Sequence, residues 1–130
     1  MILTRNFLSL AVLAIGATPC MGQFQLQCFG GRALDCSQFI TPFCNGLTAD
    51  GPVASGDIVS RCFNVFNGLR CDLTALNTGA NATTSAAANC STAMKAVSGG
   101  CPSDGSATFS NSFYFQLDPN TGRCAIPGGN

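Results

Sequence analysis

The stretch IVSRCFNVFNGLRCDLTAL, residues 58–76, carries the clearest structural signal in the chain. Two runs rich in β-branched and aromatic residues flank the dipeptide Asn67-Gly68. Asn-Gly supplies the two left-handed residues that a two-residue type I′ turn needs. The stretch therefore predicts an antiparallel β-hairpin.

A two-residue turn would also set which side chains of this hairpin share a face. Cys62 and Cys71 would then lie diagonally on one face, too far apart for an easy disulfide, so we expect each to bond with another element. Their face is the more apolar one and is expected to meet the core. The core-face pairs are Phe66–Leu69, Asn64–Cys71 and Cys62–Leu73, and the other-face pairs are Val65–Arg70, Phe63–Asp72 and Arg61–Thr74.

A helical pattern precedes the hairpin, in residues 35–47. Asp35 is a good N-cap and Gly46 a plausible stop, whereas Pro42 would either kink the helix or restart it. Residues 48–57, rich in Gly, Pro and Ser, are expected to form a loop. The apolar stripe of the helix consists of Cys36, Phe39, Ile40, Phe43, Cys44 and Leu47.

A second helical pattern follows the hairpin, in residues 81–98, and Gly99-Gly100 suits its C-terminal end. Its start is ambiguous because Thr83, Thr84 and Ser85 could each cap it. The apolar stripe consists of Ala86, Cys90, Ala93, Met94 and Val97.

Three further strands complete the predicted order. Residues 24–29 and 108–117 alternate apolar and polar side chains, residues 118–122 suit a turn, and residues 123–126 could pair back. The order is β-α-β-β-α-β-β. This order predicts an α+β domain with a five-stranded, mainly antiparallel sheet and two packed helices.

The first 22 residues have the features of a secretory signal peptide. One Arg precedes the apolar run FLSLAVLAIGA, residues 7–17, and small residues follow it. This run is too short to span a membrane, and the alternative is a buried N-terminal helix. Cleavage after Ala17 would keep Cys20, whereas cleavage after Gly22 would remove it. We expect the second cut, a single domain over residues 23–130, and an extracellular protein.

Removal of Cys20 leaves eight of the nine cysteines, an even number. The chain has no His and no Cys-X-X-Cys pair, so four disulfides are favoured over a metal site. Eight cysteines allow 105 pairings, and the sequence does not choose among them. These cysteines are Cys28, Cys36, Cys44, Cys62, Cys71, Cys90, Cys101 and Cys124.

Charges are sparse in the expected mature chain, with five basic residues against six Asp and no Glu. No basic run could neutralise phosphates, which argues against a nucleic-acid partner. No second apolar run could insert into a membrane. Asn81 and Asn89 begin sequons and are candidates for N-glycosylation.

Catalytic residue types are few. Without His or Glu, neither a Ser-His-Asp nor a Cys-His site can form, and only a pair of aspartates could serve a glycosidase. Residues 118–122 resemble half of a calcium loop, but the closing acidic residue is missing, so a plain turn is expected. We expect no catalysis, no cofactor and no metal.

A binding function is therefore favoured. The polar side of residues 108–116 includes Tyr114 and suits hydroxyl-rich ligands. Arg61, Arg70 and Asp72 are expected on one hairpin face beside Phe63, where charged groups could bind glycan hydroxyls. The alternative is a solvated face with a surface ion pair. The candidate glycan-binding residues are Arg61, Arg70, Asp72 and Tyr114.

Three segments resemble a family of small secreted cysteine-rich glycan-binding proteins of ink-cap mushrooms and other fungi. They are FQLQCFGGRALDCSQFITPFC, RCFNVFNGLRCDL and FSNSFYFQLDPNTGRC. The resemblance spans essentially the whole chain after the leader. It implies a lectin without enzymatic activity, an αβα-sandwich-like fold, homodimers with one ten-stranded sheet, and glycans of the fucosylated GalNAc–GlcNAc type as ligands on target cells.

Two other classes of function remain open on the sequence. One is a killer-toxin-like protein or effector that acts on a protein target. The other is a small protease inhibitor, which would need an exposed rigid loop such as residues 48–57 or 101–107. A glycan array separates the lectin from both.

Overall fold

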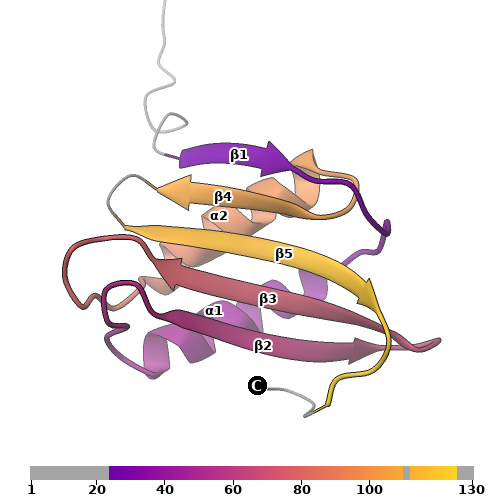
Figure 1. Cartoon of the computed structure of the whole chain (residues 1–130), viewed down its shortest axis with the longest axis horizontal. Coiled ribbons are helices and arrows are strands. Elements are labelled where there is room, and N and C mark those ends of the chain that lie inside the picture. The colour runs from indigo at the N-terminus through magenta and orange to yellow at the C-terminus, as the bar shows by residue number, and fades with distance from the viewer. Residues whose placement is uncertain (1–23, 110–111, 126–130) are drawn as a thin grey trace, which may run out of the picture.

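The computed structural model describes residues 24–109 and 112–125; the expected leader and Cys20 lie outside this range. The elements follow the predicted order, β-α-β-β-α-β-β (Figure 1). They are β1 (Phe24–Cys28), α1 (Ile40–Ala49), β2 (Ile58–Val65), β3 (Leu69–Asn77), α2 (Ala87–Gly100), β4 (Gly105–Phe109) and β5 (Phe113–Thr121), with the 3₁₀ turn η3 (Ser37–Phe39) before α1.

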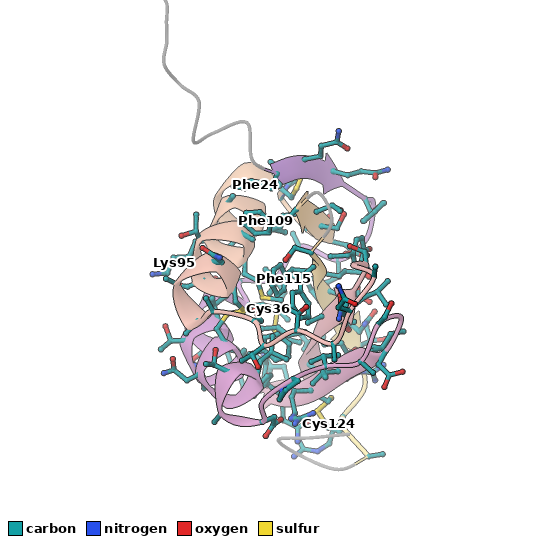
Figure 2. The ribbon with its side chains drawn as sticks, turned by 90° about the vertical axis from the view of Figure 1, so that its left-hand side faces the viewer. Phe24, Cys36, Lys95, Phe109, Phe115 and Cys124 are labelled. Carbon is teal, nitrogen blue, oxygen red and sulfur yellow. A yellow bond between two sulfur atoms is a disulfide. The ribbon has the colours of Figure 1, made fainter. Side chains whose placement is uncertain are left out.

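The five strands form one sheet in the order β1-β4-β5-β3-β2, and every neighbouring pair is antiparallel. This confirms the α+β prediction. Both helices lie on the same side of the sheet, as Figures 1 and 2 show. The chain alone thus has one helical layer and one sheet layer, where the resemblance implied helices on both sides. No helix of the described residues covers the other side of the sheet.

The core lies between the helices and the sheet. Phe113, Phe115 and Leu117 of β5 point into it, as their alternation predicted. The helices contribute most of their predicted stripes, including Ile40 of α1 and Met94 of α2, both fully buried. Burying these apolar side chains is the main favourable term in folding.

The β2–β3 hairpin forms where Asn67-Gly68 predicted it, but the predicted register is wrong by one residue. The turn has three residues, 66–68, with Asn67 at φ 65° and Gly68 at φ 71°. Val65 therefore pairs with Leu69. A one-residue slip moves every side chain of a strand to the other face.

The observed register places Phe63 and Val65 on the helix side of the sheet. Phe63 now lies on the helix side, where its ring stacks on Phe39 with centroids 4.7 Å apart. Val65 is buried as well, while Asn64 moves to the uncovered side. The packing of Phe63 and Val65 against the helical layer, with the Asn64 amide left outside the core, favours the three-residue turn.

The last two strands have different bounds from those predicted. Residues 108–117 are not one strand, because β4 ends at Phe109 and β5 begins at Phe113. Residues 118–121 continue β5 and do not form a turn, and Arg123 is not in a strand. Pro119 is tolerated because β4 pairs with β5 only as far as Leu117, which leaves an open strand edge beside Pro119.

The helix bounds also shift. Pro42 is the third residue of α1, where a backbone N–H has no acceptor within the helix, so no kink is needed. Gly46 does not end α1, which continues to Ala49. Asp35 accepts a hydrogen bond from the Ser37 N–H at 2.9 Å, at the start of η3. Helix α2 begins at Ala87 and includes both Gly99 and Gly100.

All eight predicted cysteines form disulfides. Cys62 and Cys71 bond with other elements, as expected. Within the described residues no helix is long and apolar enough to cross a membrane. The pairs are Cys28–Cys101, Cys36–Cys71, Cys44–Cys90 and Cys62–Cys124.

Candidate functional site

The side of the sheet turned away from the helices, here called the open face, is largely polar. Its polarity follows from the alternation of side chains along each strand, which point in turn toward and away from the helices. In β3, Cys71, Leu73 and Ala75 are buried under the helices, while the alternating Asp72 and Thr74 are half-buried on the open face. The polar side chains of the open face are Gln25, Gln27, Ser60, Asn64, Arg70, Asp72, Thr74, Ser106, Thr108, Tyr114, Gln116, Asp118 and Asn120.

Arg70, Asp72 and Asn120 form a hydrogen-bonded group on this face, which we call the Arg70 cluster. Asp72 Oδ2 accepts from Arg70 Nε at 2.9 Å and from Asn120 Nδ2 at 2.7 Å. A second guanidinium nitrogen of Arg70 donates to the Thr121 carbonyl at 2.9 Å. The mutual bonds hold three polar groups in one arrangement before any ligand arrives.

The Arg70 cluster keeps polar atoms available. Within the described part of the chain, no hydrogen bond involves the Asp72 Oδ1, the Asn120 Oδ1 or the Arg70 Nη2. The two oxygens are acceptors and the guanidinium nitrogen is a donor. A ligand with hydroxyl and carbonyl groups close together can satisfy all three atoms.

A second group lies farther along β5. Tyr114 Oη donates to Gln116 Oε1 at 3.1 Å, and Gln116 Nε2 donates to Asp104 at 3.2 Å. Tyr114 and Asp118, the residue beside Asp72 in the register, are four residues apart on one strand, or about 13 Å. The structure thus separates Tyr114 from the predicted pair Arg70 and Asp72.

Asp104 has an unusual environment at this second group. Burial raises the pKa of Asp104 above its ordinary value of 3.8, and the neighbouring Asp118 carboxylate adds to the rise. The hydrogen bond from Gln116 acts in the opposite direction. A carboxyl group with a raised pKa beside a second carboxylate is also an arrangement that glycosidases use.

Arg61 does not share a face with Arg70 and Asp72, so that part of the prediction is wrong. The observed register places Arg61 on the helix side of β2, opposite Leu73. Its guanidinium donates to Asp50 Oδ2 at 2.8 Å, just beyond the end of α1. Arg61 is therefore a link between α1 and the sheet edge.

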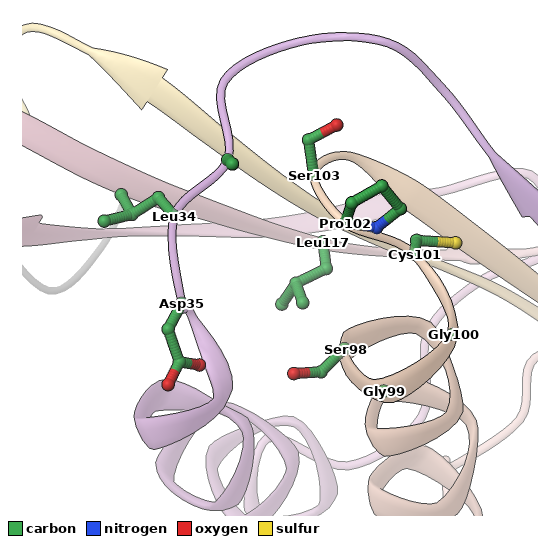
Figure 3. Close-up of a pocket in the computed structure, with 10 residues that line it drawn as sticks. Leu34, Asp35, Ser98, Gly99, Gly100, Cys101, Pro102, Ser103 and Leu117 are labelled. Atoms are coloured by element: carbon green, nitrogen blue, oxygen red, sulfur yellow. The ribbon is translucent and has the colours of Figure 1, made fainter.

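A cavity of about 630 Å³ lies elsewhere, at the C-terminal end of α2 (Figure 3). The Asp35 carboxylate and the Ser98 hydroxyl contribute polar groups to its lining, and Leu34 and Leu117 contribute apolar ones. Hydrogen bonds from Ser37 lower the pKa of Asp35. None of the described residues that line the cavity is basic. The cavity is therefore rich in acceptors and poor in strong donors.

The remaining candidate positions are also placed by the fold. Asn81 and Asn89 are both exposed, although Asn89 precedes Cys90, whose disulfide joins α2 to α1. The two loops that an inhibitor could use are partly structured: Val53 pairs with Thr83, and residues 105–107 belong to β4. No group of three potential metal ligands occurs in the described residues.

The sequence prediction missed two contributors to the open face, Asn120 and Asp104. Asn120 falls in the predicted turn, although the polar alternation of Tyr114 and Gln116 continues through Asp118 to Asn120. That uninterrupted period of two was the available signal. Asp104 precedes β4 in a segment with no local pattern.

Residues 35–124, well over half of the 130-residue chain, match the family model described as Glycan binding domain Y3. The matched segment includes the Arg70 cluster and the Tyr114–Gln116–Asp104 group. It begins after β1. A comparison with curated proteins found no match.

Proposed function

The chain belongs to the Glycan binding domain Y3 family, and from this premise we propose that it is a lectin that binds glycans on its open face without cleaving them. The observation that carries the proposal is the Arg70 cluster, which combines a carboxylate, an amide and a guanidinium. Sugars present alternating hydroxyl donors and acceptors, so they need both kinds of partner in one place. The cluster supplies both.

The open face is favoured over the cavity near Asp35 because the open face offers hydrogen-bond donors. The cavity is concave, which by itself would favour it as a ligand site. Its strongest polar group, however, is an acceptor, and the C-terminal end of α2 adds further acceptors. A glycan with acetamido groups also presents carbonyl acceptors, which Arg70 can bind.

For the ligand we propose glycans that contain GalNAc or fucose, of the fucosylated GalNAc–GlcNAc type. This proposal rests on the resemblance in three sequence segments, and the Arg70 cluster is compatible with it. Arg70 would donate to an acetamido carbonyl, while Asp72 and Asn120 would accept from ring hydroxyls. Tyr114 would contact a more distant sugar of an extended glycan.

We further propose that residues 1–22 are removed and that residues 23–130 act outside the cell, on glycans of target cells. Four disulfides in a small domain are compatible with an oxidising compartment. Strands β1 and β2 are the two outer strands of the sheet, and a homodimer could form by pairing one of them with a second copy. Mass measurement in solution would test the dimer.

The first prediction concerns the Arg70 cluster. The oxidised protein is applied to a glycan array, and the dissociation constant of the best ligand is measured. Arg70→Lys and Asp72→Asn should each weaken binding about 10- to 100-fold, because each removes a hydrogen bond to a charged group. Absence of any selective binding by the folded wild-type protein would contradict the lectin proposal.

Matched controls locate the site. Arg61→Lys makes the same change on the helix side and should leave the dissociation constant within about twofold of wild type. Asp35→Asn and Ser98→Ala alter the cavity and should also have little effect. If these two variants abolish binding while Arg70→Lys does not, the glycan binds in the cavity and the open face is excluded.

A glycosidase is the second candidate, favoured by the carboxyl pair Asp104 and Asp118. The bound glycan is incubated with the protein, and its products are analysed by mass spectrometry. A lectin leaves the glycan intact. Release of a shorter glycan by the wild type, but not by Asp104→Asn, would instead establish hydrolysis.

A further inference from the structure

Phe66 has the greatest exposure of the large apolar side chains in the described residues. It is 75% exposed, compared with 62% for Ile58 and 44% for Leu26. The sequence predicted the opposite, a core position opposite Leu69. The three-residue turn instead makes Phe66 the first residue of the hairpin tip. The protein thus presents an aromatic ring to solvent at the end of β2.

The tip that carries Phe66 is held from several directions. Gly68 accepts a hydrogen bond from the Gly122 N–H at 2.7 Å, which ties the turn to the end of β5. The Asn64 side chain accepts from the Cys124 N–H at 2.8 Å. The Cys62–Cys124 disulfide fixes the same segment covalently. These contacts fix the backbone that carries the ring, so little backbone freedom is lost on binding.

The tip and the Arg70 cluster belong to the same end of the sheet. Arg70 and Asn120 pair in the register, one residue from the Leu69–Thr121 pair that adjoins the turn. Arg70 also donates to the Thr121 carbonyl, and Gly122 contacts the turn through Gly68. The exposed ring and the available polar atoms are therefore presented within a few residues of one another.

We propose that Phe66 is the apolar platform of the glycan site, on which one face of a pyranose ring packs while the Arg70 cluster binds its polar groups. The inference rests on the proposed glycan-binding function. Pyranose rings carry hydroxyls at their edge and C–H groups on their faces. Galacto-configured sugars such as GalNAc group several C–H bonds on one face, so an aromatic ring beside a polar cluster favours them over gluco-configured sugars.

The test uses the absence of tryptophan from the chain. Phe66→Trp introduces a single indole at the tip, and its fluorescence is followed while GalNAc or the best array glycan is added. The emission should change saturably with a dissociation constant within about threefold of wild type. Phe66→Ala should bind at least 10-fold more weakly, while its melting temperature stays close to that of wild type because the side chain is exposed.

Ile58→Trp is the matched control, since Ile58 is also exposed and apolar but begins β2, at the end of the strand far from Phe66. Its emission should not respond to the glycan. If the wild type binds and Phe66→Ala binds equally well, the platform is excluded while the lectin proposal stands. If the wild type binds no glycan, both fail. If Phe66→Ala converts a dimer to a monomer with unchanged affinity per chain, Phe66 serves assembly and the platform is likewise excluded.

Discussion

At the scale of single residues, the negative charge of Asp104 on the open face lowers the stability of the folded protein. Its pKa is raised in the folded protein, chiefly by burial and then by Asp118. The folded state therefore holds the Asp104 proton more tightly than the unfolded state does. Stability that is present below pH 3.8 is lost as the pH rises through the raised pKa.

Asp104→Asn should remove this loss of stability at higher pH. The amide stays uncharged at every pH and can still accept the bond from Gln116. We expect a higher melting temperature than wild type at pH 7 and a smaller difference near pH 3. Asp57→Asn makes the same charge change on an exposed side chain and controls for net charge. A variant that melts below wild type at both pH values would contradict this account.

At the scale of elements, the contact between α2 and β4 depends on a residue without a side chain. A Cβ built on Gly105 would lie 2.6 Å from Cys101 Sγ and 2.9 Å from Val97 Cγ1. Both neighbours are fixed, one by a disulfide and the other by the helix core. The close approach of the last turn of α2 to β4 at Gly105 therefore requires a residue without a Cβ.

Gly105→Ala should lower the free energy of unfolding by about 1–3 kcal/mol, as overpacked substitutions do. Gly46→Ala is the contrasting variant, because a Cβ added to Gly46 inside α1 would have no neighbour within 4 Å. It should raise the free energy of unfolding by up to about 1 kcal/mol. Urea denaturation measures both, and equal effects of the two substitutions would refute the packing argument.

The hairpin shows which information about elements the sequence contains. Asn67-Gly68 located the turn, because few other dipeptides adopt two left-handed conformations. It did not set the length of the turn, since the choice between two and three residues depends on what each register buries against η3 and α1. That choice involves Phe39, which is distant in sequence.

The candidate site was only partly predictable for the same reason. The predicted and the observed registers both place Arg70 and Asp72 on the side away from the helices, but only the observed register turns Arg61 toward the helices. The helix stripes and the inward side of β5 were predictable because they depend on local period. The break between β4 and β5 was not, since the alternation continues up to it without a Gly or Pro.

At the scale of the whole molecule, the two helices act as one layer because a disulfide joins them. Cys44 of α1 and Cys90 of α2 are both buried, and their bond closes a sequence separation of 46 residues. A loop of this length loses considerable entropy on closure in the unfolded chain. The bond therefore stabilises the whole fold mainly by restricting the unfolded state.

Replacing both Cys44 and Cys90 with Ser should lower the free energy of unfolding by about 2–4 kcal/mol. Glycan affinity should remain within about twofold of wild type, because the open face lies on the other side of the sheet. Thermal unfolding and the array ligand measure the two effects. A strong loss of affinity in a variant that is still folded would show that the helical layer controls the open face.

The four disulfides share a further regularity. Each one joins a member of the first four bonded cysteines, at positions 28, 36, 44 and 62, to a member of the last four, at 71, 90, 101 and 124. A chain that enters an oxidising compartment from its N-terminus thus exposes four thiols before any correct partner has emerged. Every early crosslink is a mispairing that must later be exchanged. If the chain is secreted, its folding yield therefore depends on thiol exchange, the reaction that a disulfide isomerase catalyses.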